Sequence, residues 1–184
     1  MKTLAFAAVV PALMLLPACA ADEGAPASAG STAAAPGARA MLAASDGTPK
    51  GEATISEAPG GLRVVVKAMG VTPGVHAVHI HTTGVCTAPD FASAGGHWNP
   101  TKHQHGADNP MGKHMGDMPN MTVGDDGTGM IDYLVPQGML TGGDMPLLDA
   151  DGAAVVIHAV ADDNKSDPAG NAGGRIACGV VTAG

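Results

Sequence analysis

The chain has 184 residues, of which 17 are Asp or Glu and 9 are Lys or Arg, which gives a formal net charge of −8 at pH 7. This length suits one domain of ordinary size with additional segments, and the acidic balance argues against binding of nucleic acid, because phosphate recognition needs a basic surface. Two Phe, one Trp and one Tyr leave little for base stacking, so the core must come from Val, Ile, Leu, Ala and Met.

The first twenty residues have the pattern of a targeting segment. Lys2 supplies the positive start, and residues 4–16 form an apolar stretch that is too short to span a bilayer comfortably. The letters LPAC at 16–19 resemble a bacterial lipobox with Cys19 as the lipidated residue, whereas ACA at 18–20 fits ordinary cleavage. We predict that residues 1–19 are a signal peptide of the lipoprotein type, with simple cleavage as the alternative.

Export follows from either form of cleavage. The chain is then periplasmic or part of the cell envelope, and either tethered to a membrane through Cys19 or released. Residues 20–38 are rich in Ala, Pro, Gly and Ser and nearly free of large apolar side chains, so we expect a disordered linker. The folded domain is predicted to span residues 39–184.

Short strands, and no long helical periodicity, are predicted within this domain. Residues 62–68 alternate between apolar and polar positions, and residues 154–160 and 175–181 are further runs of β-forming residues. Asp-Gly pairs at 46–47, 126–127 and 151–152 are typical of hairpin turns. The pattern indicates an all-β sandwich or barrel, with two long loops at 82–119 and 162–174 that we expect to be functional.

Three cysteines are present, and two of them, Cys86 and Cys178, lie in the folded region. A disulfide between them would leave Cys19 as the odd residue, which lipidation or cleavage accounts for. Disulfides persist in the oxidising compartments to which the targeting segment points, and two buried free thiols are the alternative.

Two imidazoles share one face of a predicted strand in the stretch GVHAVHIH. His79 and His81 are two residues apart and point the same way, whereas Val78 and Ile80 point the other way. His158, in a second predicted strand, supplies another imidazole. Two to four imidazoles suit Cu(II), which favours nitrogen ligands, so we predict a copper site here.

The first long loop contains a second set of ligand types. His97, His105, His114 and Asp117 offer three imidazoles and a carboxylate, and the spacing HMGD lets the last two converge across a tight turn. Such a set completes a tetrahedral zinc site without an open position, which is the arrangement of structural zinc. Met111, Met115, Met118 and Met121 surround His114; we favour packing for them, with Cu(I) acquisition as the alternative.

The stretches GVHAVHIH, GVCTAPDFASAGGHWNP, HQHGADNP, GKHMGDMPN, VVIHAVADD and GNAGGRIACGV together resemble the Cu,Zn superoxide dismutase family in its bacterial exported form. The resemblance covers about residues 39–181, which is essentially the whole predicted domain. It implies an eight-stranded Greek-key β-barrel, an immunoglobulin-like sandwich with two long functional loops. It also implies one copper and one zinc ion per subunit, and Cys86–Cys178 as the family's disulfide.

The resemblance also assigns roles residue by residue. His97 would bridge the metals, Asp162 would connect the ligands of the two metals, and Arg175 would orient an anionic substrate beside copper; His97 and Arg175 are thus the catalytic candidates. His76 would be structural and His103 a loop residue. The implied ligand sets are, for copper, His79, His81, His97 and His158, and for zinc, His97, His105, His114 and Asp117.

The function implied is dismutation of superoxide to oxygen and hydrogen peroxide by alternating Cu(II) and Cu(I), which would protect the cell envelope. The alternative is a non-catalytic extracytoplasmic copper- or zinc-binding protein on the same scaffold, because fold alone does not determine function. The expected partner is superoxide, with Lys102, Lys113 and Lys165 near its approach. Whether the protein is a monomer or a homodimer stays open.

Overall fold

The structure is a computed structural model, and it describes residues 37–184 together with Met1 and Thr3. The rest of the predicted signal peptide, with its Cys19, and nearly all of the predicted linker lie outside the described residues. The described part consists of β-strands joined by turns and loops, with one short 3-10 helix, η1 (Ala92–Ala94). None of its helices is long and apolar enough to cross a membrane. The strands are β1 (Gly37–Ala43), β2 (Pro49–Ala58), β3 (Gly61–Ala68), β4 (Gly74–His76), β5 (Val78–His81), β6 (Met121–Val123), β7 (Gly129–Pro136), β8 (Ala154–His158), β9 (Arg175–Val180) and β10 (Thr182–Ala183).

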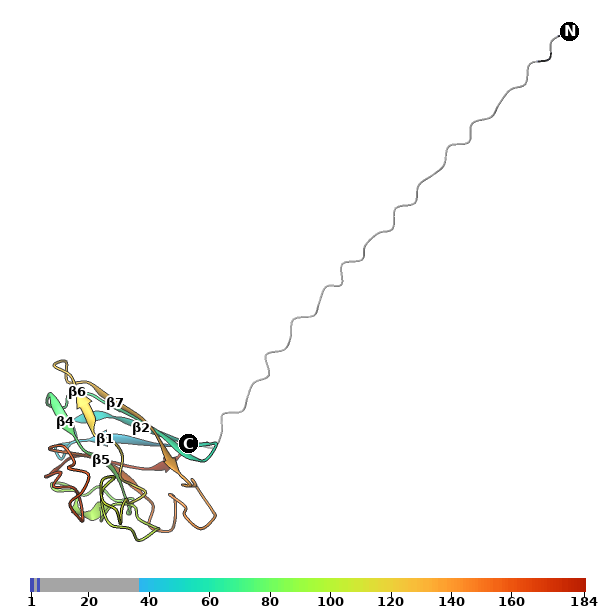
Figure 1. The fold of residues 1–184 in the computed structure, drawn as a ribbon. Helices are drawn as coiled ribbons and strands as arrows, with labels where there is room; N and C mark the ends of the chain where they lie inside the picture. The colour runs from blue at the N-terminus through green and yellow to red at the C-terminus, as the bar shows by residue number, and fades with distance from the viewer. Residues whose placement is uncertain (2, 4–36) are drawn as a thin grey trace. The chain divides into compact units, whose positions relative to one another are not determined.

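All strand pairs are antiparallel, and the sheet runs in the order β4-β6-β7-β3-β2-β1-β9-β8-β5 (Figure 1). Only Ala77 separates β4 from β5, so the two ends of this order are halves of one strand and the sheet closes on itself. Counted in this way, and without the two-residue β10, the barrel has the eight strands that the family resemblance implied. The connections from β3 to β4 and from β7 to β8 cross over other strands, which makes the topology a Greek key.

Alternation along the strands produces the core. In β3, residues 62, 64, 66 and 68 are buried and their neighbours face outward, as the sequence predicted. Register with β2 and β7 is unbroken along the whole of β3, so one side of the barrel is a regular four-stranded surface of β1, β2, β3 and β7. Because few aromatic residues are available, the interior is filled mainly by small and branched aliphatic side chains.

Two of the three Asp-Gly pairs form the hairpin turns that were predicted. Asp46 and Asp126 each accept a hydrogen bond at Oδ1, from the amide of Thr48 and of Thr128 at 2.9 Å, in the turns β1–β2 and β6–β7. The third prediction is wrong: Gly152 lies in the long connection from β7 to β8 and packs against Gly84. An Asp-Gly pair satisfies the local geometry of a turn but does not determine whether the flanking segments pair.

The two predicted functional loops are long segments without strands, apart from isolated bridges, between β5 and β6 and between β8 and β9. They lie next to each other: the amide of Asp108 in the first loop donates to the carbonyl of Asn164 in the second at 2.9 Å. Both gather at the lower side of the barrel in the view of Figure 1. β1 begins at Gly37, so the strand includes the last two residues of the predicted linker.

Candidate metal centre

β5 places two histidines at the edge where the long loops cover the barrel. Its register with β8 sets His79 opposite Val156 and His81 opposite Ala154, while Val78 and Ile80 turn into the core. All four residues of β5 are buried, because the first long loop covers the side that would otherwise face solvent. The strand therefore presents two imidazoles side by side in a space closed to water.

The first loop is fixed to β5 by backbone hydrogen bonds. The amide of Trp98 donates to the carbonyl of Ile80 at 2.8 Å, and the amide of Ile80 donates to the carbonyl of Gly116 at 3.0 Å. A Cβ on Gly116 would lie 2.2 Å from the carbonyl oxygen of Ile80, so only glycine fits at this approach. These bonds hold His97 and Asp117, the neighbours of Trp98 and Gly116, beside the strand.

Four buried histidines converge in the first donor set: His79, His81, His97 and His158. One ligand atom from each lies within 4.8 Å of the others. Nε2 of His81 and Nε2 of His158 are 3.3 Å apart, and Nδ1 of His81 lies 2.9 Å from the carbonyl oxygen of Gly95. That carbonyl orients the ring so that Nε2 points into the set.

The second donor set comprises His97, His105, His114 and Asp117, again with ligand atoms within 4.8 Å of one another. Nδ1 of the three histidines lies 2.8, 3.1 and 3.3 Å, respectively, from Oδ1 of Asp117. Its other oxygen, Oδ2, accepts hydrogen bonds from the amides of Gly106 at 3.0 Å and His114 at 2.9 Å. The backbone of the loop therefore fixes the carboxylate, and the three imidazoles surround its free oxygen.

His97 belongs to both sets. Nδ1 of this ring faces Asp117, and Nε2 is buried without a hydrogen-bond partner among the described residues. Nδ1 of His79, in the first set, and Nδ1 of His105, in the second, are also buried without a hydrogen-bond partner within residues 37–184. Unpartnered buried nitrogens are costly, and a metal ion in each set would satisfy all three.

Asp162 connects the two sets through the outer nitrogens of one histidine in each. Oδ2 lies 2.8 Å from Nε2 of His79, and Oδ1 lies 2.9 Å from Nε2 of His105. Asn120 holds the backbone of Asp162, since its side chain donates to the carbonyl and accepts from the amide, both at 2.8 Å. Gly170 leaves room for this contact: a Cβ there would lie 1.8 Å from Oδ1 of Asp162. Nothing in the sequence alone marked Asn120 or Gly170 as residues that support the site.

Burial keeps three of these rings neutral. It lowers the pKa of His81 to about 2, of His158 to about 3 and of His97 to about 4. A neutral imidazole has a free nitrogen at pH 7 and is therefore ready to act as a ligand.

The two carboxylates make the second set attractive to cations. Burial alone would lower the pKa of His105, yet the neighbouring carboxylates of Asp117 and Asp162 raise it to about 9. Burial would likewise raise the pKa of both carboxyl groups, but the surrounding imidazoles hold each of them well below its usual value. Three imidazoles and a carboxylate fit zinc, and four imidazoles fit copper.

Arg175, in β9, is held beside the first set. Its Nη1 and Nη2 donate to the carbonyls of Phe91 and Gly95, both at 2.6 Å. The carbonyl of Gly95 therefore serves both Arg175 and His81.

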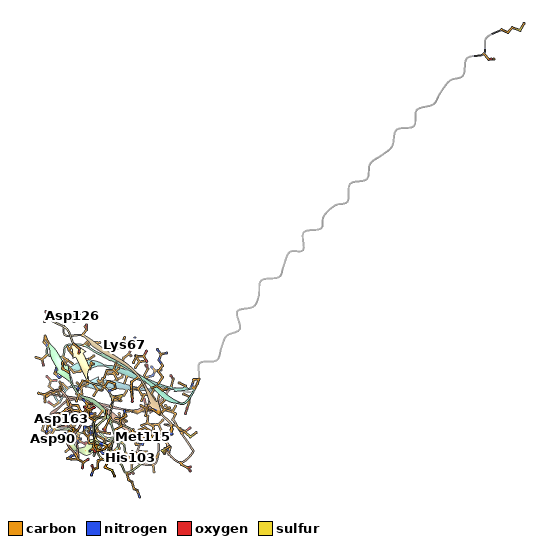
Figure 2. All side chains as sticks on the ribbon, viewed as in Figure 1. Lys67, Asp90, His103, Met115, Asp126 and Asp163 are labelled. Carbon is orange, nitrogen blue, oxygen red and sulfur yellow. A yellow bond between two sulfur atoms is a disulfide. The ribbon has the colours of Figure 1, made fainter. Side chains whose placement is uncertain are left out.

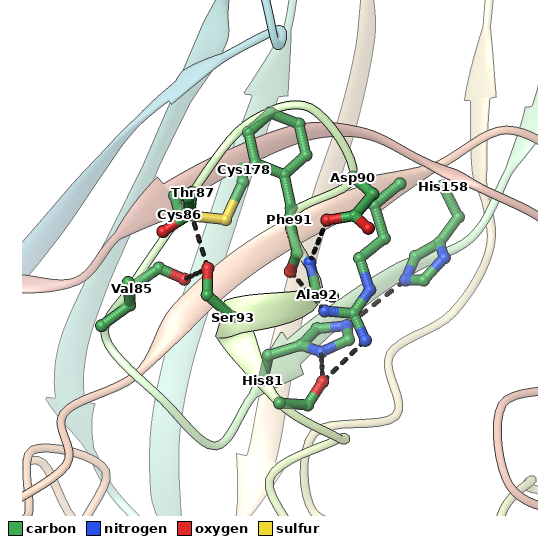
Figure 3. Close-up of a disulfide and its surroundings, with 12 residues drawn as sticks. His81, Val85, Cys86, Thr87, Asp90, Phe91, Ala92, Ser93, His158 and Cys178 are labelled. Carbon is green, nitrogen blue, oxygen red and sulfur yellow. Dashed lines mark hydrogen bonds between the residues drawn. A yellow bond between two sulfur atoms is a disulfide. The ribbon is translucent and has the colours of Figure 1, made fainter.

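A disulfide secures the part of the loop that holds these carbonyls. Cys86 is bonded to Cys178 of β9, with a Cα–Cα distance of 5.7 Å and a sequence separation of 92, as predicted (Figure 3). Ser93 adds a local tie, since its hydroxyl accepts from the amide of Thr87 and donates to the carbonyl of Val85. Figure 3 shows His81 and His158 on the same side of this loop.

The remaining histidines, methionines and Lys113 that the sequence drew attention to have structural or solvent-exposed positions and are not part of either donor set. His76 is buried, with ring nitrogens 2.8 and 2.9 Å from the carbonyls of His158 and Thr72, and His103 is exposed. Three of the four clustered methionines, Met115, Met118 and Met121, are part of the core, and Met111 is exposed. Lys113 does not extend freely toward the approach as expected, because its Nζ donates to the carbonyl of Asp117 and to the hydroxyl of Tyr133.

Comparison with known proteins points to one family. The family profile described as copper/zinc superoxide dismutase (SODC) matches residues 49–181. "Superoxide dismutase [Cu-Zn] 1" of Aquifex aeolicus is 49% identical over 123 residues, which are 66% of this chain and 73% of the relative. The "Superoxide dismutase-like protein YojM" of Bacillus subtilis is 44% identical over 123 residues, 66% of this chain and 63% of that protein.

A crystal structure of a SOD-like protein from Bacillus subtilis superposes with a TM-score of 0.74 at 39% identity. The superposition covers 77% of this chain and 96% of that one. Similarity in sequence and in structure therefore extends over the part of the chain that carries both donor sets.

Replacing Gly170 by alanine tests the link through Asp162. The added Cβ would displace Oδ1 of Asp162 and Nε2 of His105, from which it would be 1.8 and 2.6 Å away. We expect zinc affinity to fall about 10- to 100-fold, as is typical when the outer partner of a ligand is lost. Competition with a chelator, followed by metal analysis, measures the change.

The matched control is Gly142→Ala. Gly142 has a similar left-handed φ of 71° against 64° for Gly170, but no atom lies within 4 Å of its Cβ position. This variant has the same backbone strain and should keep its zinc. Equal zinc affinity in the two variants would contradict a special role for Asp162.

Proposed function

This chain belongs to the copper/zinc superoxide dismutase family, and we propose that it dismutes superoxide, with one copper and one zinc ion in each subunit. The observation that carries the proposal is His97, a ring whose two nitrogens face two different buried donor sets. A site for one metal alone would not need a shared imidazole. The four-histidine set would hold copper, and the set that contains Asp117 would hold zinc.

The chemistry divides between the metal and the residues around it. Copper held by the four histidines would supply a one-electron couple for the oxidation of one superoxide to oxygen and the reduction of a second, which takes two protons from solvent to become hydrogen peroxide. The guanidinium of Arg175 attracts and orients the anion, because two carbonyls hold it in place and leave its charge uncompensated by any ion pair among the described residues. Nε2 of His97 can hold a proton while Nδ1 stays fixed beside Asp117.

A non-catalytic metal-binding protein is the rival. The Bacillus subtilis relative is named only as dismutase-like, so membership of the family does not by itself establish activity. A metal buffer has no need of Arg175 beside a complete set of four histidines. Metal content and superoxide dismutation, measured together on the purified protein, separate the two: stoichiometric copper without activity would favour the buffer.

We also propose export to the periplasm or the cell envelope, with a tether through lipidated Cys19. The support is the targeting pattern of residues 1–19 together with a disulfide in the folded domain, which suits an oxidising compartment. A tethered dismutase would remove superoxide at the membrane surface and protect the envelope.

Two substitutions separate the metals. We expect His158→Ala to remove most of the activity and the bound copper while zinc stays, because His158 belongs only to the first set. Asp117→Ala should release zinc and loosen the first loop, because Asp117 is the common neighbour of three imidazoles. Full zinc occupancy in Asp117→Ala, measured by metal analysis, would show that the assignment is wrong.

Charge at the approach gives a kinetic prediction. Superoxide is an anion and the chain has a net charge of −8, so a local positive potential is needed. Lys165 is exposed in the second long loop, and Arg175 is beside the first set. We expect added salt to slow the second-order rate, Lys165→Glu to slow it further at unchanged metal content, and Arg175→Ala to slow it most.

Lys67→Glu is the control for this series. It makes the same change in net charge, but at a position far from the second long loop. Figure 2 shows Lys67 on the opposite side of the barrel from Asp163, which is two residues before Lys165 in that loop. A rate that is independent of salt and equally affected by both lysine substitutions would contradict steering by the loop.

Lipidation is tested by Cys19→Ser. If the lipobox is used, the wild-type protein partitions into the membrane fraction, whereas the variant is released or misprocessed. Equal soluble release of the two proteins would leave simple cleavage as the correct interpretation.

A further inference from the structure

One lysine connects a turn of the second donor set to the wall of the barrel. Residues 113–117, here called the ligand turn, begin with Lys113 and contain His114 and Asp117 of that set. Nζ of Lys113 donates to the carbonyl oxygen of Asp117 at 2.8 Å and to the hydroxyl oxygen of Tyr133 at 2.5 Å. Lys113 therefore joins the two ends of the ligand turn to each other and to β7.

The other hydrogen bonds of the ligand turn do not reach β7. The amide of His114 donates to Oδ2 of Asp117 at 2.9 Å, and the amide of Asp117 donates to the carbonyl of His114 at 3.2 Å, so both bonds are internal. Gly116 connects the turn to β5, because its carbonyl accepts from the amide of Ile80 at 3.0 Å. Lys113 thus supplies a second point of attachment, on a different strand.

β7 is a firm base for this attachment. It pairs with β3 in unbroken register, in which Tyr133 is opposite Val64. Val64 is fully buried, and the half-buried ring of Tyr133 packs against the same core. Because close packing limits the movement of core side chains, the hydroxyl oxygen that accepts from Lys113 has a well-defined position.

Packing does not hold the ligand turn on the side of this contact. A cavity of about 290 Å³ adjoins the contact, and its lining includes Ala107 and Asn164 of the two long loops and Tyr133 of β7. Lys113 and Asp117 line the same cavity, so the ligand turn has room to shift into it. The hydrogen bonds of Lys113 restrict this shift where side chains do not.

The contact leaves the carboxylate of Asp117 free for its own partners. Nζ of Lys113 binds the backbone carbonyl of Asp117 and forms no ion pair with any carboxylate among residues 37–184. An ion pair with the carboxylate of Asp117 would compete with a bound cation for its negative charge. A hydrogen bond to the carbonyl positions the residue without this competition.

We propose that Lys113 and Tyr133 are positioning residues of the second donor set, which hold His114 and Asp117 in the arrangement that retains zinc. The inference rests on the proposed assignment of zinc to this set. Neither positioning residue belongs to the set itself, so both act through the ligand turn. Oδ1 of Asp117 lies 2.8 Å from Nδ1 of His97, so a displaced turn would also disturb the ring that the two sets share.

Release of zinc into excess chelator tests the proposal. Lys113→Met keeps an apolar side chain but removes the ammonium group, so the ligand turn loses both hydrogen bonds. We expect zinc to leave this variant about tenfold faster than it leaves the wild-type protein, in line with the loss of affinity that removal of an outer partner causes. Equal rates of release from the two proteins would overturn the proposal.

Tyr133→Phe tests the anchor on β7 by removing a single acceptor. The ring stays, and the ammonium group of Lys113 lies 4.7 Å from its centre in the native protein. Release of zinc should be faster than from the wild-type protein and slower than from Lys113→Met. The double variant should release zinc no faster than Lys113→Met, because both substitutions act through one contact. Additive effects would contradict this shared route.

Cobalt(II) in place of zinc gives a spectroscopic measure of the ligand positions. The visible absorption of Co(II) depends on the geometry of its ligands, and a general loss of stability does not alter it while the protein stays folded. We expect the spectrum to change in Lys113→Met and to change less in Tyr133→Phe. Spectra identical to that of the wild-type protein would show that the contact does not position the ligands.

Hydrogen exchange of the metal-free protein separates this inference from the proposed function. Amides of the ligand turn should exchange faster in Lys113→Met than in the wild-type protein, whereas amides of β3 should keep their protection. A wild-type protein that takes up neither zinc nor Co(II) in the second set would contradict the zinc assignment, and exchange would still test the contact. Equal exchange of the ligand turn in the two proteins would overturn the role of Lys113.

Lys102→Met is the matched control. Lys102 is exposed in the same long loop, and its ammonium group forms no hydrogen bond or ion pair among residues 37–184. This variant loses the same charge and should keep the release rate, the spectrum and the exchange of the wild-type protein. Equal effects of Lys102→Met and Lys113→Met would mean that loss of charge, and not the contact, is responsible. Circular dichroism confirms that each variant is folded; if Lys113→Met is not, Tyr133→Phe decides.

Discussion

The hydrogen bonds of Asp162 determine which nitrogens of the metal centre are free. Its two oxygens accept from Nε2 of His79 and Nε2 of His105, one ring from each donor set. A neutral ring that donates at Nε2 has its lone pair at Nδ1, and Nδ1 of both rings is the atom that is buried without a partner among the described residues. One carboxylate therefore fixes the tautomer and the orientation of a ligand in each set. Asn120 and Gly170 matter because they hold the backbone of Asp162 and leave space for its contacts.

The centre is assembled from parts of different rigidity. His79, His81 and His158 lie on paired strands, whereas His97, His105, His114 and Asp117 lie in one long loop. The loop contributes Trp98, Met115 and Met118 to the core, and its position also depends on backbone bonds to β5 and on the cluster around Asp117. Two buried carboxylates also need positive charge nearby, which a bound metal ion would supply and which, until a metal binds, a proton on His105 supplies in part. Metal binding and ordering of the loop are therefore coupled, because both satisfy the same buried groups.

The parts of this arrangement that follow from local periodicity could be predicted from the sequence. The two-residue spacing of His79 and His81 was enough to place both rings on one face, and alternation identified β3. The sequence could not show that Trp98 and Gly116 pair with Ile80, because these two residues lie in a loop whose own sequence favours no strand. Lys113 was misjudged for a similar reason: its partner Tyr133 is in β7, twenty residues away. Gly170 looked like any loop glycine, since only the folded chain places it against Asp162.

The disulfide affects the chemistry at a distance from its own sulfur atoms. Arg175 is oriented by the carbonyls of Phe91 and Gly95, and both belong to the segment that Cys86 ties to β9. Gly95 also orients His81, so movement of this segment would disturb the guanidinium of Arg175 and a ring of the first donor set together. A reducing compartment would remove the tie and leave only weaker local bonds, such as those of Ser93. Oxidising conditions would therefore contribute to the geometry of the centre as well as to the stability of the fold, because they preserve the bond between Cys86 and Cys178.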